Sequence, residues 1–159
     1  TLPSVNFRQE IILRSRKLSV VNDSAATTEE ATMALLRRFC NNSKKSKNRC
    51  VLITGGTNKN LSYCQLAKEI KRRILSKHLI LLDGSATKVL IKELQKIGYW
   101  NKEMRVRDTL RECVNTASQI PISRNKIILF SSGAASFEKF KNEFDRGEQF
   151  NQLSRKYFQ

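Results

Sequence analysis

The sequence predicts an α/β fold, a Rossmann-like and mostly parallel sheet with helices on both faces. Short apolar runs at 50–54, 78–82 and 127–130 have the continuous hydrophobicity of strands that are buried on both faces. Between these runs, apolar residues recur at helical spacing. Strands that alternate with helices are typical of a parallel sheet with right-handed crossovers, and 159 residues fit a single domain.

The chain begins with a predicted hairpin. Residues 7–13 and 18–21 have the composition of strands, and they flank the polar segment 14–17. Thr27 and Glu30 then have the spacing of a capping box, so we expect Thr27 to cap the first helix.

The remaining elements alternate as strand and helix. We expect a helix from about Leu61, after the strand at 50–54, and another that ends near Gly98, after the strand at 78–82. A further helix is predicted at 108–118. Ligands of open parallel sheets bind beyond the carboxyl ends of the strands, so we expect the functional site in the loops that follow them.

The last strand, at 127–130, leads into a loop of small residues and then into a predicted helix. Ser136 is a plausible N-cap of that helix. Three phenylalanines follow at core-like helical spacing: Phe137, Phe140 and Phe144. A helix N-terminus after such a loop can bind an anion or a carboxylate, because its backbone N–H groups lack partners. The alternative is an ordinary βα unit whose serines are turn residues.

The charge balance favours anionic partners. Lys and Arg number 30 against 14 Asp and Glu, a net charge of +16, which suits nucleic acid, anionic lipid, nucleotides or carboxylates. Alternatively, much of the excess lies on solvated helix faces. The 40% hydrophobic content excludes disorder, and no apolar run approaches a membrane span. No signal peptide pattern is visible, and the chain starts at Thr1, so we expect one domain of a longer cytoplasmic protein.

The reactive residue types argue against several kinds of site. Cys40, Cys50, Cys64 and Cys113 form no C-x-x-C pair, and His78 is the only histidine. We therefore expect no metal site, no Cys–His or Ser–His–Asp nucleophile and no catalytic residue in this chain. Scattered cysteines in apolar surroundings are typical of a reducing cytoplasm.

Four residues remain as candidate ligand contacts, each with a structural alternative. Lys59 ends a Gly-Gly-Thr-Asn-Lys loop that does not match the P-loop pattern; it could hold a carboxylate or be a solvated lysine. Asp23 could accept hydrogen bonds from ribose hydroxyls or be an Asx-turn residue. Thr27 and Ser136 could touch a ligand or serve only as helix caps.

Three segments together resemble a known family. They are 22–28 (NDSAATT), 53–59 (ITGGTNK) and 129–150 (LFSSGAASFEKFKNEFDRGEQF). They resemble, in order and spacing, motifs of the C-terminal domain of the Mur ligases, most closely of the members that add D-glutamate. The resemblance covers essentially the whole chain, so residues 1–159 would be this domain. The related folylpolyglutamate synthases fit the last motif less well.

The resemblance implies an ATP-dependent amide ligase of peptidoglycan precursor synthesis. Such an enzyme joins D-glutamate to UDP-N-acetylmuramoyl-L-alanine through an acyl phosphate. ATP and Mg²⁺ would be bound mainly by a central domain, and the UDP group by an N-terminal domain, neither of which is in this chain. The C-terminal domain alone is then expected to be inactive. By motif, D-glutamate or the nascent peptide would contact Thr27, Lys59, Ser136 and Phe137, and the ribose of the nucleotide would lie near Asp23. It would also lie near Arg8, because Leu2-Pro3 followed by Phe7-Arg8 resembles the segment that enters this domain.

Two positions depart from the family pattern. Ala25 replaces a lysine of the first motif, which removes a cation from the mouth of the site. Glu143 stands where the family has an aromatic residue, with Phe144 one place later. The alternative function is a basic α/β nucleic-acid-binding module, which would need aromatic side chains poised to stack on bases.

Overall fold

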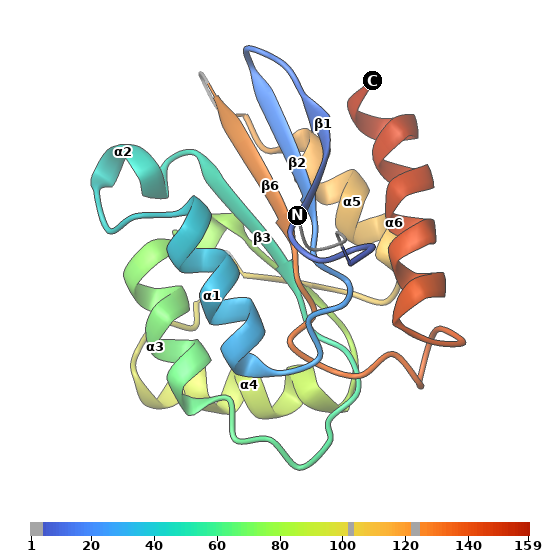
Figure 1. The fold of residues 1–159 in the computed structure, drawn as a ribbon. Helices are drawn as coiled ribbons and strands as arrows, with labels where there is room; N and C mark the ends of the chain where they lie inside the picture. Colours follow the sequence, from blue (N-terminus) through green and yellow to red (C-terminus); the bar gives the residue numbers. More distant parts are fainter. Residues whose placement is uncertain (1–4, 102–103, 122–124) are drawn as a thin grey trace.

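An open, twisted sheet lies between two layers of helices (Figure 1). The computed structural model describes residues 5–101, 104–121 and 125–159. The strands in this part of the chain are β1 (Glu10–Arg14), β2 (Leu18–Asn22), β3 (Cys50–Thr54), β4 (Leu79–Leu82), β5 (Arg105–Arg107) and β6 (Lys126–Phe130). Their order is β1-β2-β6-β3-β4-β5; β1 runs antiparallel to β2, and the other neighbours are parallel. The mostly parallel sheet and the N-terminal hairpin are confirmed.

The helices divide between the two faces of the sheet. They are α1 (Glu29–Phe39), α2 (Lys44–Lys47), α3 (Cys64–Arg73), the 3-10 turn η1 (Ser76–His78), α4 (Ser85–Lys96), α5 (Leu110–Gln119) and α6 (Glu143–Phe158). Helices α1, α3 and α4 cover one face, and α5 and α6 cover the other (Figure 1). None of the helices in the described residues is long and apolar enough to cross a lipid bilayer.

Strand β3 contributes side chains to two hydrophobic clusters, one on each face of the sheet. All five of its residues are buried. Leu52 packs with the cluster beneath α1, α3 and α4, whereas Val51 and Ile53 pack with the cluster beneath α5 and α6. Because side chains alternate along a strand, a strand covered on both faces must be apolar throughout. The continuous apolar run is thus explained.

The first helix starts one residue later than predicted. Thr28, not Thr27, is the N-cap, and its hydroxyl accepts a hydrogen bond from the backbone N–H of Ala31. The buried carboxylate of Glu29 accepts a hydrogen bond from the backbone N–H of Leu66 in α3. This contact between α1 and α3 places Glu29 in the first turn, so the predicted capping box at Thr27 is wrong.

The predicted cap at Ser136 is also wrong. A turn at 137–139 and bends at 140–142 follow Ser136, and α6 begins at Glu143 behind Asn142, whose side chain accepts hydrogen bonds from two backbone N–H groups. The phenylalanines do not form one buried stripe: Phe137 is 66% exposed and Phe144 is 51% exposed. The reason is that the chain after Ser136 turns along the loop that follows β3 instead of entering a helix.

Other boundaries differ by smaller amounts. Strand β5 was not predicted, because Val106 lies between two arginines and the strand therefore has no apolar run. Helix α3 begins at Cys64 rather than near Leu61, and α5 begins behind Thr109, which forms a capping box with Glu112. The expected turn at Gly98, in a left-handed conformation just past α4, is present.

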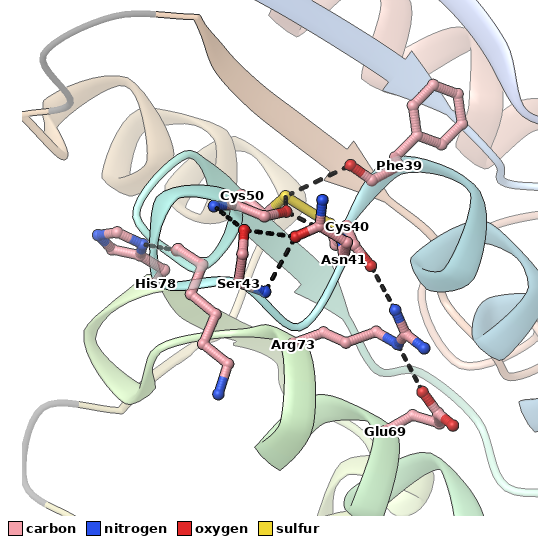
Figure 2. The surroundings of a disulfide bond; sticks show 10 residues. Phe39, Cys40, Asn41, Ser43, Cys50, Glu69, Arg73 and His78 are labelled. Carbon is pink, nitrogen blue, oxygen red and sulfur yellow. Dashed lines mark hydrogen bonds and ion pairs between the residues drawn. A yellow bond between two sulfur atoms is a disulfide. The ribbon is translucent and has the colours of Figure 1, made fainter.

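A disulfide joins Cys40, at the end of α1, to Cys50, the first residue of β3 (Figure 2). The surroundings are polar: Arg73 donates to the carbonyl oxygen of Cys40 at 2.6 Å and to the carboxylate of Glu69 at 2.7 Å. This pairing differs from the free thiols typical of a reducing cytoplasm. Spacing in the sequence does not reveal it, because the end of α1 meets β3 only in the folded chain.

Candidate functional site

The loops that follow β2, β3 and β6 meet at one edge of the sheet. Thr57 and Ala135 exchange two backbone hydrogen bonds, at 3.0 and 3.1 Å. Closer to the strands, the hydroxyl of Thr54 donates to the carbonyl oxygen of Ser132 at 3.1 Å. We call this connected surface the carboxyl-end rim, made of residues 23–28, 55–59 and 131–138.

The rim brings Lys59 and Phe137 together. The ammonium nitrogen of Lys59 lies 5.1 Å from the centroid of the Phe137 ring, within the range of a cation–π contact. Both side chains are exposed, whereas Ser136 beside them is only 4% exposed. An exposed ammonium next to an aromatic face can receive the carboxylate of a small amphipathic ligand.

Glu138 ties a third loop to this cluster. Its backbone N–H donates to the hydroxyl of Thr57 at 3.0 Å, and its carboxylate accepts hydrogen bonds from the backbone N–H and the hydroxyl of Ser85. A carboxylate at the first turn of α4 is stabilised by the helix dipole. Sequence reasoning missed Glu138, because its partner precedes it by 53 residues.

The rim loops pack tightly against one another. Only about 10 Å³ of cavity remains among Gly56, Thr57, Ser136 and Glu138. That volume holds at most about one water molecule. A ligand must therefore bind on the outer, exposed side of the loops, against Lys59 and Phe137.

Asp23 and Arg8 lie on the other part of the rim. The carboxylate of Asp23 accepts hydrogen bonds from the backbone N–H of Gln9 and the hydroxyl of Ser131, both at 3.0 Å. Burial raises the pKa of Asp23 to about 6, although these hydrogen bonds and the charge of Arg8 oppose the rise. Arg8 is exposed, and its guanidinium lies 3.5 Å from the carbonyl oxygen of Ala25.

The turn that carries Arg8 is held from two sides. Asp23 binds the backbone of Gln9, and the ring of Phe7 packs on Gly147 of α6. A Cβ at Gly147 would come within 2.6 Å of the Phe7 ring, so only glycine admits this close approach. The position of Arg8 is therefore set by buried contacts rather than by its own side chain.

Arg146 connects the two parts of the rim. This side chain is fully buried and donates to the hydroxyl and the carbonyl oxygen of Ser24 at 3.0 and 2.7 Å. It also donates to the carbonyl oxygens of Ala134 and Ala135, each at 3.1 Å. Burial lowers the pKa of Arg146 to about 10. The only sequence signal for this residue was its place in the last motif.

Thr27 lies next to Ala26, which contacts the small-residue loop after β6. The hydroxyl of Ser132 donates to the carbonyl oxygen of the preceding Ala26 at 2.9 Å. Thr27 itself is half-buried. The structure thus brings Lys59, Ser136 and Phe137 into one cluster and Arg8 and Asp23 into a second, and Thr27 follows Asp23 on the loop after β2.

The donor set of the described residues does not fit a metal ion. Within residues 5–101, 104–121 and 125–159, no three His, Cys, Asp or Glu side chains lie close enough together to hold one. Asp23, the buried carboxylate of the rim, already has hydrogen-bond donors on both oxygens.

Comparisons with known proteins relate the chain to ligases. It is 40% identical over 152 residues to the UDP-N-acetylmuramoylalanine–D-glutamate ligase of Borreliella afzelii, covering 94% of this chain and 31% of that protein. The ligases of the same name from Roseiflexus (37% identity over 153 residues) and Treponema pallidum (33% over 157) cover 96% and 98% of this chain. The chain spans only 31% and 27% of their lengths. No protein-family model matches the sequence.

A solved structure shares the fold. The UDP-N-acetylmuramate–alanine ligase of Thermotoga maritima superposes on 96% of this chain with a TM-score of 0.58 and 17% sequence identity, and the match covers 30% of that protein. The resemblance predicted from the motifs is confirmed. Nearly the whole of this chain is homologous to a segment of Mur-family ligases, and that segment makes up about 30% of their length.

Proposed function

We propose that residues 1–159 are the C-terminal domain of an ATP-dependent ligase that adds D-glutamate to UDP-N-acetylmuramoyl-L-alanine in the cytoplasm. The observation that carries this proposal is the backbone pairing of Thr57 with Ala135, which sets Lys59 beside Phe137. The similarity to D-glutamate ligases supports the same assignment.

In this proposal, Lys59 binds a carboxylate of D-glutamate. Its ammonium is exposed, and the neighbouring ring of Phe137 limits the directions from which water can reach the ion pair. Ser136 and Thr27 complete the substrate side of the rim. The tight packing of the loops beneath keeps these groups in place before the substrate arrives, which lowers the entropic cost of binding.

Arg8 and Asp23 form the nucleotide side. Arg8 points its charge toward the position of Ala25, where relatives with the family pattern carry a lysine. We infer that Arg8 supplies the cation that Ala25 removes. Asp23 acts mainly by holding the Arg8 turn through Gln9, and each of its carboxylate oxygens keeps a lone pair that could accept a hydrogen bond from the ribose.

The remaining parts of the reaction are assigned to domains outside this chain. ATP and Mg²⁺ would be held mainly by a central domain, where the ATP supplies the phosphoryl group that activates the carboxylate. The present residues bind and orient D-glutamate and cover the reacting groups from water.

The full-length protein offers a direct test. With ATP and Mg²⁺, it should release phosphate and form an amide with D-glutamate but not with L-glutamate, whereas the 159-residue chain should do neither. Equal rates with both enantiomers, or a preference for another amino acid, would contradict the proposed substrate.

A further inference from the structure

A second pocket lies away from the carboxyl-end rim, between β5 and α5. Its volume is about 410 Å³, and we call it the basic pocket. It is lined by Lys77, His78, Arg105, Arg107, Thr116, Gln119, Ile120 and Pro121. Lys77 and His78 precede β4, Arg105 begins β5 and Ile120 directly follows α5, so the pocket lies near the amino ends of β4 and β5.

The charge of the basic pocket has one sign. Lys77, Arg105 and Arg107 contribute three cations, and its lining within the described residues contains no carboxylate. His78 is buried, and its burial lowers its pKa, so it adds no charge at neutral pH. A cleft lined by charges of one sign concentrates ions of the opposite sign.

Strand β5 directs two of these cations into the pocket. Arg105 and Arg107 are two positions apart, so they lie on the same face of the strand. That face is turned toward α5, because the Arg107 guanidinium donates to the hydroxyl of Thr116 at 3.0 Å. Val106, on the opposite face, packs against the hydrophobic cluster beneath α1, α3 and α4.

The Arg107 guanidinium is held in place with donors to spare. Its Nε binds Thr116 and its Nη1 binds the carbonyl oxygen of Val106 at 2.9 Å. Within the described residues, Nη2 and the side chains of Arg105 and Lys77 have no hydrogen-bond or ion-pair partner. A fixed guanidinium with free donors is suited to phosphate, which it can bind through two parallel hydrogen bonds.

The size and the lining favour a small ligand. A volume of about 410 Å³ lies in the usual range of small-molecule sites. Among the described lining residues there is no Phe, Tyr or Trp on which a base could stack, and the ring of His78 is only 3% exposed, whereas single-stranded nucleic acid would require an accessible ring. We propose that the basic pocket binds a phosphate-bearing small molecule through Arg105, Arg107 and Lys77.

Protection of the sheet edge is a competing explanation for the two arginines of β5. Inward-pointing charges on an edge strand discourage pairing with another chain, and β5 is an edge strand. Edge protection requires only that β5 carry charge; it requires neither a fixed Arg107 nor any affinity for phosphate. Binding measurements therefore separate the two explanations.

The test titrates the chain with inorganic pyrophosphate by isothermal calorimetry, at low and at physiological salt. We expect saturable binding of one pyrophosphate, weakened about tenfold by Arg105→Gln and again by Lys77→Gln. The matched control is Lys92→Gln, which removes one charge from an exposed site on α4 and should change the affinity less than about twofold.

Three results would overturn the proposal. One is no saturable binding of pyrophosphate by the original chain, which is what edge protection predicts. Another is an equal loss of affinity in Lys92→Gln and Arg105→Gln, which would indicate attraction to net charge alone. The third is an RNA dodecamer that binds in an Arg105-dependent way while pyrophosphate does not, which would favour a polymeric partner. Thermal unfolding of each variant checks that the fold is intact.

Discussion

The cations at the carboxyl-end rim and in the basic pocket differ in burial and in hydrogen bonding. In the rim, the guanidinium of Arg146 is fully buried and donates to Ser24, Ala134 and Ala135. In the basic pocket, Arg105 and Lys77 reach solvent and have no partner among the described residues. The rim cation holds loops together, whereas the pocket cations remain available to a ligand.

This difference shows how to distinguish structural charges from binding charges in a chain of +16. A buried cation whose donors reach backbone oxygens supports the fold, because removing it leaves those oxygens without donors. An exposed cation beside a cavity contributes little to stability. Lys59 on the rim is also an exposed cation, and it projects from the loop after β3, whose Thr57 accepts a hydrogen bond from the backbone N–H of Glu138.

The largest expected loss of stability comes from a backbone change under the rim. Gly55 has φ +118°, and a Cβ there would collide with the carbonyl oxygen of Leu82 and the hydroxyl of Thr87. Gly55→Ala should lower the free energy of unfolding by about 3 kcal/mol or more, measured by urea denaturation.

Gly98→Ala is the matched control. Gly98 also has a positive φ, of +68°, but a Cβ added at this position would have no atom within 4 Å. We expect this variant to lose only about 1 kcal/mol. Equal losses in the two variants would mean that the close contact of Gly55 with Leu82 and Thr87 adds nothing to the backbone strain.

Arg146→Met should be nearly as damaging. It leaves the buried backbone oxygen of Ser24 without its donor and removes one of the two donors to the backbone oxygen of Ala134, a loss of about 3 kcal/mol by denaturant unfolding. Arg155→Met, at an exposed position of the same helix, should stay within about 0.5 kcal/mol of the original chain. If the two variants unfolded alike, Arg146 would not connect the rim.

Asp23 should make the stability of the chain depend on pH. Its pKa is raised by burial from 3.8 to about 6, so the folded chain retains a proton that the unfolded chain loses between these values. The contribution of Asp23 to stability is therefore complete below pH 3.8 and is lost as the pH rises through about 6. Relative to Asp23→Asn, the original chain should lose about 2 to 3 kcal/mol between about pH 4 and pH 7. A constant difference between the two proteins across that range would contradict a raised pKa.

Reduction of the Cys40–Cys50 disulfide should have the smallest and most local effect on stability. The bond lies at the amino end of β3, away from the rim, and closes a loop with a sequence separation of 10 residues. Reduction should cost about 2 kcal/mol of stability. Thiol titration of the denatured chain should find the two free cysteines, Cys64 and Cys113, before reduction and four afterwards. Four thiols before reduction would exclude the bond.

The sheet could be predicted because its signals are local. Apolar runs and the loops that end them lie within a few residues, and they indicated both the parallel sheet and the edge where the candidate residues meet. The starts of α1 and α6 could not be predicted, because they depend on the contact of Glu29 with α3 and on the pairing of Thr57 with Ala135. Strand β5 and the Cys40–Cys50 disulfide likewise depend on neighbours that are distant in sequence.

If the full-length protein is the ligase proposed above, its KM for D-glutamate tests the rim most directly. Lys59→Met should raise this KM about tenfold or more while the 159-residue chain keeps its stability, because Lys59 has no structural partner besides the Phe137 ring among the described residues. Lys92→Met, on the exposed face of α4, should leave it within about twofold. An unchanged KM in Lys59→Met would contradict the claim that the paired loops after β3 and β6 present one carboxylate-binding surface.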